Sequence, residues 1–418
     1  NVIAMLTGVL VARTLGPSGA GQSQLPLLIN LFLGTVLAMG VGQATVYFIN
    51  NRKVPIRRVT STLLMFLAVW FPSSVLLTWS AYLLFPGFFG NLPVMITLFF
   101  CIGNAVNRMA NQLVPVLLAE FRAAATAAME VAERLAQIVA VTTLVLIGSL
   151  TVHSFLLCSL VSGSAKLLLA LWLLRAHIEW SWRPDWSLIR GLIGYGLKLT
   201  AAVVALNAHL IAPAMLLRVY VEDFEPIGLY TRAIAVCALV SVVASATGPL
   251  LYSAWAYVDS DDRRARQVEL AARLYSLLGL SAALVVALFS KGIITLLYGA
   301  AFAPAAGVLR ILVFSMAMQI VANTFQNLFP AVGRPIHATL NVVATFMINV
   351  IGCVILIPRF GIHGAAAAYA IASFTYLLVT GLGASRVCGV RLSACFVPRV
   401  DDIRRIVGAL RTKQTPSG

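Results

Sequence analysis

Five basic side chains interrupt the long apolar stretches of this 418-residue chain, where few acidic side chains could neutralise them. They are Arg108, Lys166, Lys198, Arg232 and Arg310. The acids in comparable positions are Glu130 and Glu133, and Glu130 lies four residues before Arg134, a spacing that lets the two pair on one helix face. Arg and Lys form charge-assisted hydrogen bonds to phosphate oxygens, whereas a site for a cationic molecule would use carboxylates. The set favours an anionic, phosphate-bearing ligand.

Amide side chains recur at helical spacing in the same stretches. Spacings of three and four residues place Asn104, Asn107 and Asn111 on one face of a helix together with Arg108. The polar residues expected to line a cavity are Asn104, Asn107, Asn111, Gln112, His209, Gln319, Asn323, Asn341 and Asn349. Two interpretations of the amides stay open, a hydrated cavity or hydrogen bonds between helices worth about 0.6–2 kcal/mol each. Snorkelling of the basic side chains to the interface, and simple packing of His209, are the corresponding alternatives.

Composition decides the class of protein that must position these residues. The chain is 60% hydrophobic and 11% charged, and its formal net charge is +16. A soluble domain has about 25% charged residues, so a soluble enzyme, a disordered chain and a disulfide scaffold are all excluded. The basic balance would suggest nucleic acid in a soluble protein, but with this apolar content no nucleic-acid partner is expected. The balance is typical of a many-helix membrane protein with its basic residues biased to one face.

Apolar stretches of about 20 residues, the length that crosses a bilayer as a helix, recur along the whole sequence. They predict about twelve transmembrane helices, over residues 1–13, 24–50, 60–83, 93–118, 131–150, 154–174, 191–217, 228–252, 271–290, 304–329, 339–357 and 364–384. Glycine and proline separate several of them, as in Leu15–Gly19 and Pro358–Gly361. We expect the first helix to be truncated at its N-terminal end, because its apolar run is short.

Lys and Arg outside these stretches fall mostly on one set of alternate loops. That set holds Arg52, Lys53, Arg57, Arg58, Arg122, Arg175, Arg183, Arg190, Arg263, Arg264, Arg266 and Arg334, and the segment from Ser385 onward adds seven more. Basic loops stay on the cytoplasmic side. Both termini and a basic tail, residues 385–418, are therefore expected in the cytoplasm.

The chain resembles itself at an offset of about 210 residues. Leu146–His153 aligns with Leu356–His363, and Asn107 and Asn111 align with Gln319 and Asn323. Six helices per copy give both copies the same orientation, with a pseudo-two-fold axis along the membrane normal. We therefore expect an N-terminal lobe over 1–190, a C-terminal lobe over 191–384, and a cavity between two six-helix lobes.

Catalytic and metal-binding patterns are missing from the sequence. The six cysteines form no CxxC pair and no Cys/His cluster with metal-ligand spacing. There is no Ser/His/Asp set and no buried carboxylate pair in separate apolar stretches. No enzymatic activity, metal or cofactor is predicted.

The sequence resembles the polysaccharide (O-antigen type) flippases of the multidrug/oligosaccharidyl-lipid/polysaccharide exporter superfamily over nearly its whole length. The motifs, in chain order, are Ala12–Pro17 followed by Gly21, Ile227–Tyr230, Leu297–Gly299 with Phe302–Pro304, Leu309–Leu312, Gly333–Pro335 and Leu356–Ala366. Gln22-Ser23 departs from the apolar or aromatic pair usual in the family. Each motif is weakly specific alone, and their order is what carries the resemblance.

The resemblance implies an all-α protein of the bacterial inner membrane that moves undecaprenyl-diphosphate-linked oligosaccharide between leaflets by alternating access. It also implies possible coupling to a proton or sodium gradient, and partners among membrane lipids, polysaccharide polymerases and glycosyltransferases. Two other functions remain open at this stage: a small-molecule antiporter of the same fold, and a glycosyltransferase or ligase acting on polyprenyl-linked sugar.

Overall fold

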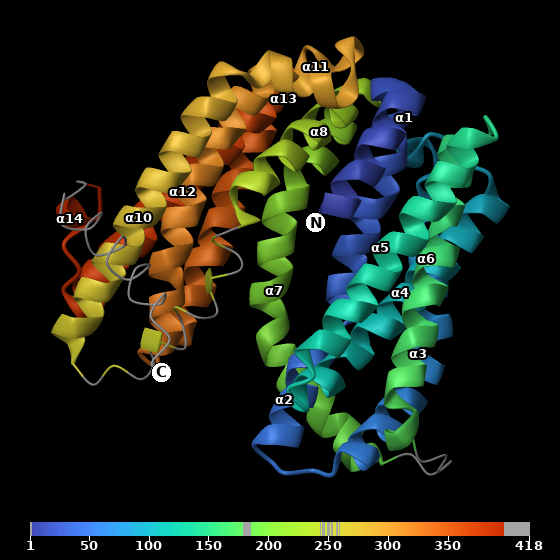
Figure 1. The fold of residues 1–418 in the computed structure, drawn as a ribbon, viewed down its shortest axis with the longest axis horizontal. Coiled ribbons are helices and arrows are strands. Elements are labelled where there is room, and N and C mark those ends of the chain that lie inside the picture. The colour runs from blue at the N-terminus through green and yellow to red at the C-terminus, as the bar shows by residue number, and fades with distance from the viewer. Residues whose placement is uncertain are drawn as a thin grey trace, which may run out of the picture. The chain divides into compact units, whose positions relative to one another are not determined.

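The computed structural model describes residues 2–178, 185–242 and 260–396, together with a few single residues between 243 and 259. This part of the chain is helical and contains no strand. It forms two compact units, one made of residues 1–231 and 294–304 and the other of residues 232–293 and 305–418. Figure 1 shows the helices of each unit running side by side in bundles.

The first unit begins with a long helix that contains a sharp kink. Its elements are α1 (Val2–Leu37), α2 (Val41–Asn50), α3 (Ile56–Leu84), η1 (Pro86–Phe89), α4 (Val94–Ala119), α5 (Ala123–Leu146), α6 (Val152–Leu174), η2 (Arg175–His177), α7 (Trp186–Tyr220), the start of α8 (Glu225–Val240), the end of α11 (Ser290–Tyr298) and η3 (Ala300–Phe302). Its core includes Trp70, Leu113 and Leu192 from α3, α4 and α7.

The second unit is built around three long helices. They are α10 (Asp261–Leu288), α12 (Ala305–Ala331) and α13 (Pro335–Cys388), and the short helix α14 (Leu392–Phe396) packs on α10. Arg273 of α10 donates to the backbone oxygen of Ala394 at 2.7 Å, and Glu269 accepts from the backbone N–H of Arg391 at 2.9 Å. These contacts fix α14 to the helix beneath it.

Glycine breaks divide two helices at the points that the sequence indicates. Gly16 has φ 69° in α1 and Gly361 has φ 54° in α13, a backbone region that glycine adopts without steric cost. The helix α13 therefore holds two of the predicted spans, and α1 holds the first span and the start of the second. In the described part of the chain, α1, α3, α6, α7 from Val203 onward, α10, α12 and α13 are long and apolar enough to cross a membrane.

Several predicted spans differ from the helices observed. The stretch 271–290 lies on α10, which starts ten residues earlier, at Asp261. The stretch 24–50 is broken at Met39 and Gly40, which both have positive φ, so it consists of the end of α1 and the separate helix α2. The stretch 131–150 lies on α5, which starts eight residues earlier, at Ala123, because alanine-rich residues 123–128 favour helix. The last part of 228–252, and residues 397–418 of the predicted tail, lie outside the described residues.

The long helix α7 belongs to the first compact unit, where it packs on α1, α2 and α3. Its residues extend this unit past the lobe boundary expected at 190/191. Gly40 and Gly196 permit this packing, since a Cβ on Gly196 would stand 2.2 Å from the backbone oxygen of Met39. The division of the sequence into repeats at that boundary stays a prediction.

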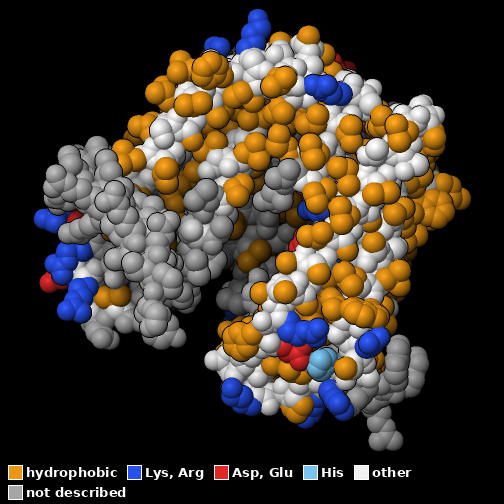
Figure 2. Space-filling view, viewed as in Figure 1, with side chains coloured by type: hydrophobic (Ala, Val, Ile, Leu, Met, Phe, Trp, Pro, Cys, Tyr) orange, Lys and Arg blue, Asp and Glu red, His pale blue; other side chains and the backbone are white. Residues whose placement is uncertain are grey.

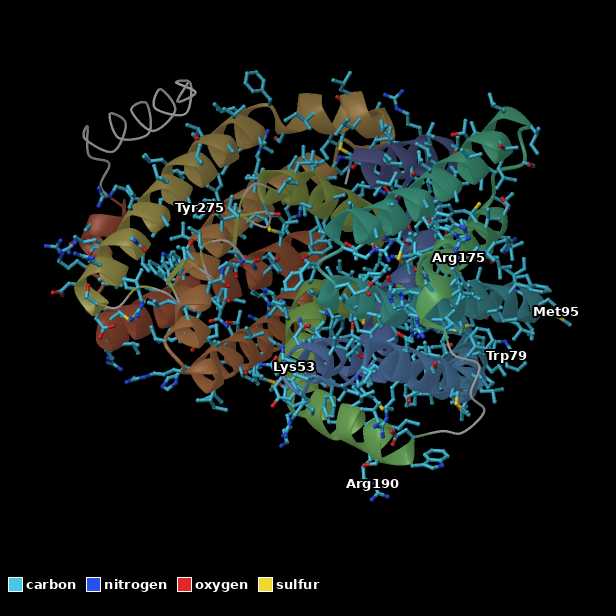
Figure 3. The ribbon with its side chains drawn as sticks, turned by 60° about the horizontal axis from the view of Figure 1, so that its bottom comes forward. Lys53, Trp79, Met95, Arg175, Arg190 and Tyr275 are labelled. Carbon is cyan, nitrogen blue, oxygen red and sulfur yellow. The ribbon has the colours of Figure 1, made fainter. Side chains whose placement is uncertain are left out.

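The outer surface has the character that a lipid-facing protein requires. Figure 2 shows hydrophobic side chains spread over the helices, with Lys and Arg gathered towards helix ends. Val69 and Leu84 on α3 are 70% and 72% exposed, and many other large apolar side chains are exposed as well. Exposure of so much apolar surface is favourable against lipid and costly in water. Arg190, near the start of α7, projects away from the ribbon in Figure 3.

Candidate functional site

A cavity of about 770 Å³ lies within the first unit, between α1, α2, α4, α5, α6 and α7. Its polar lining residues are Gln24, Asn30, Thr35, Gln43, Asn104, Asn107, Arg108, Asn111, Gln112, Glu133, Arg134, Gln137, Ser159, Ser162 and Thr200. Leu27, Leu31, Val46 and Trp70 supply part of its apolar wall. A volume of this size suits a ligand larger than an ion.

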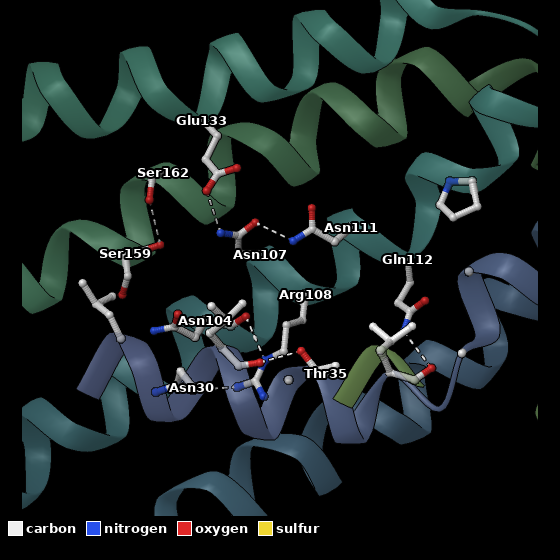
Figure 4. Close-up of a pocket in the computed structure, with 18 of the residues that line it drawn as sticks. Asn30, Thr35, Asn104, Asn107, Arg108, Asn111, Gln112, Glu133, Ser159 and Ser162 are labelled. Atoms are coloured by element: carbon white, nitrogen blue, oxygen red, sulfur yellow. Dashed lines mark hydrogen bonds between the residues drawn. The ribbon is translucent and has the colours of Figure 1, made fainter. Parts of the chain in front are cut away.

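Arg108 extends from α4 towards α1, as Figure 4 shows. Its Nε donates to the backbone oxygen of Asn104 at 3.3 Å, and Nη2 donates to Oδ1 of Asn30 at 3.0 Å. The remaining nitrogen, Nη1, is buried and has no hydrogen-bond partner in the structure. Gly34 makes room for the side chain, because a Cβ there would stand 2.9 Å from Cδ of Arg108. A guanidinium held in this way keeps a donor for an anion.

Asn30 is itself fixed by two hydrogen bonds, which keeps its oxygen directed at Arg108. Its Nδ2 donates to the hydroxyl of Tyr82 at 2.9 Å and to the backbone oxygen of Pro26 at 3.2 Å. Asn30 is 4% exposed, and sequence reasoning did not select it. A single amide in an apolar run carries little signal, so only the fold reveals this contact.

The five residues Asn104 to Gln112 predicted on one face of α4 all line the cavity. The opposite face of α4 packs into the core through Ala110, Leu113 and Leu117, so the helix turns its polar face to the cavity. Close approach of α6 completes that side. A Cβ on Gly163 would stand 2.7 Å from the backbone oxygen of Gly103, and this contact brings Ser159 and Ser162 to the lining.

Lys166 does not line the cavity. It is 1% exposed on α6, and its Nζ donates to Glu130 Oε1 at 2.5 Å and to Glu133 Oε2 at 2.8 Å. The expected pairing of Glu130 with Arg134 is replaced by this contact from another helix. A buried ammonium needs counter-charge to offset its lost hydration, and the two α5 carboxylates supply it. Lys166 therefore reaches the cavity only through Glu133.

Arg134 and Glu133 are lining residues that the sequence did not single out for the site. Nη1 of Arg134 donates to Gln137 Oε1 at 3.4 Å, and Oε1 of Glu133 accepts from Nδ2 of Asn107 at 2.8 Å. The signal available in the sequence was two adjacent charges at the start of an otherwise apolar stretch. The position of these charges in the sequence could not show that both residues would face a cavity.

Two predicted residues on α7 lie away from this lining. Lys198 is exposed, and His209 is buried at 7% exposure. Neither belongs to the lining residues of the cavity, although Thr200 and Val203 of the same helix do. The geometry thus separates the α4 residues, which meet in one site, from the two on α7.

The basic residues expected in the second half of the chain lie in the second unit, so they are not part of this cavity. Nε of Arg310 donates to the hydroxyl of Ser290 at 2.9 Å, and Arg310 itself is exposed. Arg232 is buried at 6% exposure. Their role as ligands stays a prediction.

The second-unit amides make hydrogen bonds between α12 and α13. Gln319 donates to Ser373 at 3.0 Å and accepts from Tyr369 at 3.2 Å, and Asn323 accepts from Tyr376 at 3.2 Å. Asn341 donates to Gln326 at 3.4 Å. Asn349, fully buried, accepts from the thiol of Cys353 at 3.7 Å. For Gln319, Asn323 and Asn341 the interhelical interpretation of the amides describes what the structure contains, whereas the contact of Asn349 with Cys353 lies within α13.

No group of three or more His, Cys, Asp or Glu side chains that could hold a metal ion occurs among the described residues. The six cysteines are all buried and free. The polar chemistry of the cavity therefore comes from guanidinium, amide, hydroxyl and a single carboxylate group.

The described part of the chain is a strandless bundle of long apolar helices with a polar cavity, the architecture of a polytopic membrane protein, and solved structures share this fold. A multidrug resistance MATE family transporter of the MOP superfamily, inward-facing, has a TM-score of 0.74 at 13% identity, covering 99% of this chain and 96% of its own. The lipid II flippase MurJ in an inward closed conformation has a TM-score of 0.76 at 12% identity, covering 100% and 91%. A MOP superfamily transporter from Pyrococcus furiosus has a TM-score of 0.65 at 14% identity, covering 92% of each chain.

Residues 10–307 match the family model for polysaccharide biosynthesis proteins, and the chain belongs to this family. No curated protein matches the chain. The resemblance to polysaccharide flippases is therefore confirmed at the level of family and fold.

Proposed function

We propose that this protein moves a polyprenyl-diphosphate-linked oligosaccharide across the bacterial inner membrane by alternating access. The observation that carries the proposal is Arg108, which offers an unpaired guanidinium nitrogen inside a polar cavity of a polysaccharide biosynthesis protein. A diphosphate matches this group, because phosphate oxygens accept charge-assisted hydrogen bonds from guanidinium. Arg134 supplies a second cation in the same lining.

The charge of the cavity argues for an anionic cargo over a cationic one. Its charged lining groups are Arg108, Arg134 and Glu133, and Glu133 is already neutralised by Lys166. The net charge offered to a ligand is therefore positive. The proposed undecaprenyl diphosphate carrier, with an O-antigen, capsule or exopolysaccharide unit attached, provides the complementary negative charge.

The orientation in the membrane follows from the basic loops and remains part of the proposal. Arg57, Arg58 and Arg190 are exposed near the helix ends that the positive-inside rule assigns to the cytoplasm. Substrate would then be loaded from that side, with a proton or sodium gradient as the energy source. Polymerases and glycosyltransferases are the partners that such a cargo implies, and the protein itself performs no catalysis.

The test measures lipid movement in vesicles. Wild-type protein is reconstituted with a fluorescent oligosaccharide on undecaprenyl diphosphate, and dithionite reports the fraction in the outer leaflet. Arg108→Gln should slow transfer about tenfold or more, since a charge-assisted hydrogen bond contributes about 1.5–3 kcal/mol. Arg190→Gln is the matched control, because it removes an exposed arginine of the same unit outside the cavity. Transfer by Arg108→Gln at the wild-type rate would overturn the assignment.

The two rival functions give different results in the same vesicles. A small-molecule antiporter would leave the labelled lipid in place and move a cationic dye such as ethidium. A glycosyltransferase or ligase would yield a new glycan product when an acceptor is added. Either outcome, with correctly folded protein, would replace the flippase proposal.

A further inference from the structure

A line of four polar side chains runs from a buried cation on α6 to the cavity. Lys166 donates to Glu133, Glu133 accepts from Asn107 at 2.8 Å, and Oδ1 of Asn107 accepts from Nδ2 of Asn111 at 3.4 Å. Figure 4 shows Glu133, Asn107 and Asn111 in sequence along one wall. Asn111 is exposed and lines the cavity, so the line ends where a ligand would lie.

The direction of every hydrogen bond in this line is set by Glu133. The Lys166 ammonium beside it stabilises the ionised carboxylate, which can only accept. Asn107 must therefore turn its amide nitrogen towards Glu133, and its oxygen is left facing Asn111. Asn111 must in turn present its nitrogen to Asn107, which leaves its own Oδ1 for the cavity.

Two further amides on the same helix are turned the same way. Nδ2 of Asn104 donates to the backbone oxygen of Phe100 at 2.8 Å, and Nε2 of Gln112 donates to the backbone oxygen of Ala38 at 3.3 Å. Their nitrogens are thus engaged by carbonyl groups, and their side-chain oxygens are the atoms left to a ligand. Asn104 and Asn111 stand two turns apart on α4, about 10 Å along its axis.

Arg108, on the same polar face of α4, carries the reverse chemistry. It can only donate, and it points towards α1 while Asn107 points towards α5 (Figure 4). One donor residue and several acceptor oxygens therefore share one cavity. A phosphate accepts, and the hydroxyl groups of a saccharide can donate, so the two kinds of group match the two parts of a sugar attached to a phosphate.

We infer that the oxygens of Asn104, Asn111 and Gln112 form a hydroxyl-binding subsite for the first sugars of the cargo, beside the phosphate position at Arg108. Lys166 is a positioning residue of this subsite, since it acts on the ligand only through Glu133 and Asn107. The inference rests on the proposed function, because it assigns the saccharide part of the same substrate.

The experiment compares two probes, undecaprenyl diphosphate without sugar and undecaprenyl diphosphate carrying a neutral oligosaccharide. Binding of each to purified full-length protein in detergent is measured for Asn111→Leu and Glu133→Gln. Asn111→Leu deletes an acceptor at similar volume. Glu133→Gln can both donate and accept, so the direction of the hydrogen bonds through Asn107 to Asn111 is no longer fixed. Glu130 still pairs with Lys166 at 2.5 Å, which keeps the protein folded.

Both variants should weaken binding of the sugar-bearing lipid by about three- to tenfold, the effect of one or two hydrogen bonds, and leave the sugar-free lipid unchanged. Glu130→Gln is the matched control for Glu133→Gln. Its carboxylate also contacts Lys166 but its side chain is 53% exposed and does not reach Asn107, so selectivity between the probes should stay at the wild-type value. Equal loss for both probes, or no loss for either, in stably folded variants would overturn the subsite.

Failure of the subsite can be told apart from failure of the proposed function. Arg108→Gln should weaken both probes together, because both contain the diphosphate. If Arg108→Gln changes neither probe, the phosphate position itself is wrong. If it weakens both while Asn111→Leu has no selective effect, the proposed function stands and the saccharide subsite falls.

Discussion

The amide faces of α4 and α12 use the same residue types at the same helical spacing, and the structure uses them differently. On α4 the amides line a cavity, and the nitrogens of Asn104, Asn111 and Gln112 donate to protein oxygens, which leaves the side-chain oxygens of these three residues for a ligand. On α12 they are tied to α13, Gln319 to Ser373 and Tyr369, and Asn323 to Tyr376. The difference lies in what faces the amides of each helix. Phenol and hydroxyl groups on α13 satisfy the α12 amides, whereas a cavity lies in front of α4.

A second contrast concerns charge. The α4 face connects to the buried cation Lys166 through Glu133, whereas the hydrogen bonds named between α12 and α13 join neutral groups. An ionised network holds its amides in one direction, because a carboxylate cannot donate. Neutral amides and hydroxyls can exchange the roles of donor and acceptor. The first arrangement suits a binding surface, and the second suits helix packing.

The largest stability effect is expected from Lys166→Met. It leaves the Glu133 carboxylate, 9% exposed, without its cation, and breaking a buried pair in this way costs about 3–5 kcal/mol. Thermal unfolding in detergent should show a clear fall in Tm. Lys166→Met combined with Glu133→Gln should regain most of the loss, because the remaining unpaired carboxylate, Glu130, has a side chain that is 53% exposed and can be hydrated. A Lys166→Met protein as stable as wild type would show that the ion pair of Lys166 with Glu133 does not distinguish the α4 face from the α12 face.

A smaller loss of stability is expected from Gln319→Leu in the second unit. The substitution leaves the buried hydroxyls of Tyr369 and Ser373 without this partner, at a cost of about 1–2 kcal/mol. The same unfolding measurement checks it. Binding of the sugar-bearing and sugar-free lipids should keep its wild-type ratio, and a changed ratio would place α12 in the binding surface as well.

The aligned pair Asn111 and Asn323 gives the most direct test of the comparison. Asn323→Leu removes an acceptor of Tyr376 and should cost about 0.6–1 kcal/mol of stability with no change in lipid selectivity. Asn111→Leu should do the reverse, with altered selectivity and little change in Tm. Equal behaviour of the two variants in both measurements would mean that the two faces have one role.

The smallest effect concerns pH and the start of α7. Asp185 accepts from the backbone N–H of Leu188 at 3.1 Å and from Arg58, and these contacts hold the pKa of its carboxyl below the ordinary value. A lowered pKa in the folded state means that the stabilisation is present above the unfolded pKa, about 3.9, and is lost as pH falls through the folded value. Hydrogen exchange in the first turn of α7 should therefore rise at low pH, after correction for the intrinsic rate. Asp185→Asn, which can still cap the helix, should show a weaker dependence.

Several features of the fold could be read from the sequence because they depend on neighbouring residues. The breaks at Gly16 and Gly361 follow from glycine next to proline or between apolar runs, and the structure places positive φ at both. The break at Met39 and Gly40 was missed, since no proline or polar residue marks it. It depends on Gly196 of α7 lying against Met39, a contact across more than a hundred residues.

The sequence by itself determined the class of protein, its helical passes, and the polar face of α4, because apolar length and helical spacing are local properties. Only the tertiary structure decided which polar residues line a cavity and which are hydrogen-bonded to another helix. Glu133 meets Asn107 across 26 residues and Lys166 across 33, and Gln319 meets Ser373 across 54. A buried charge or amide takes its role from the partner that offsets its lost hydration, and that partner is chosen by helix packing.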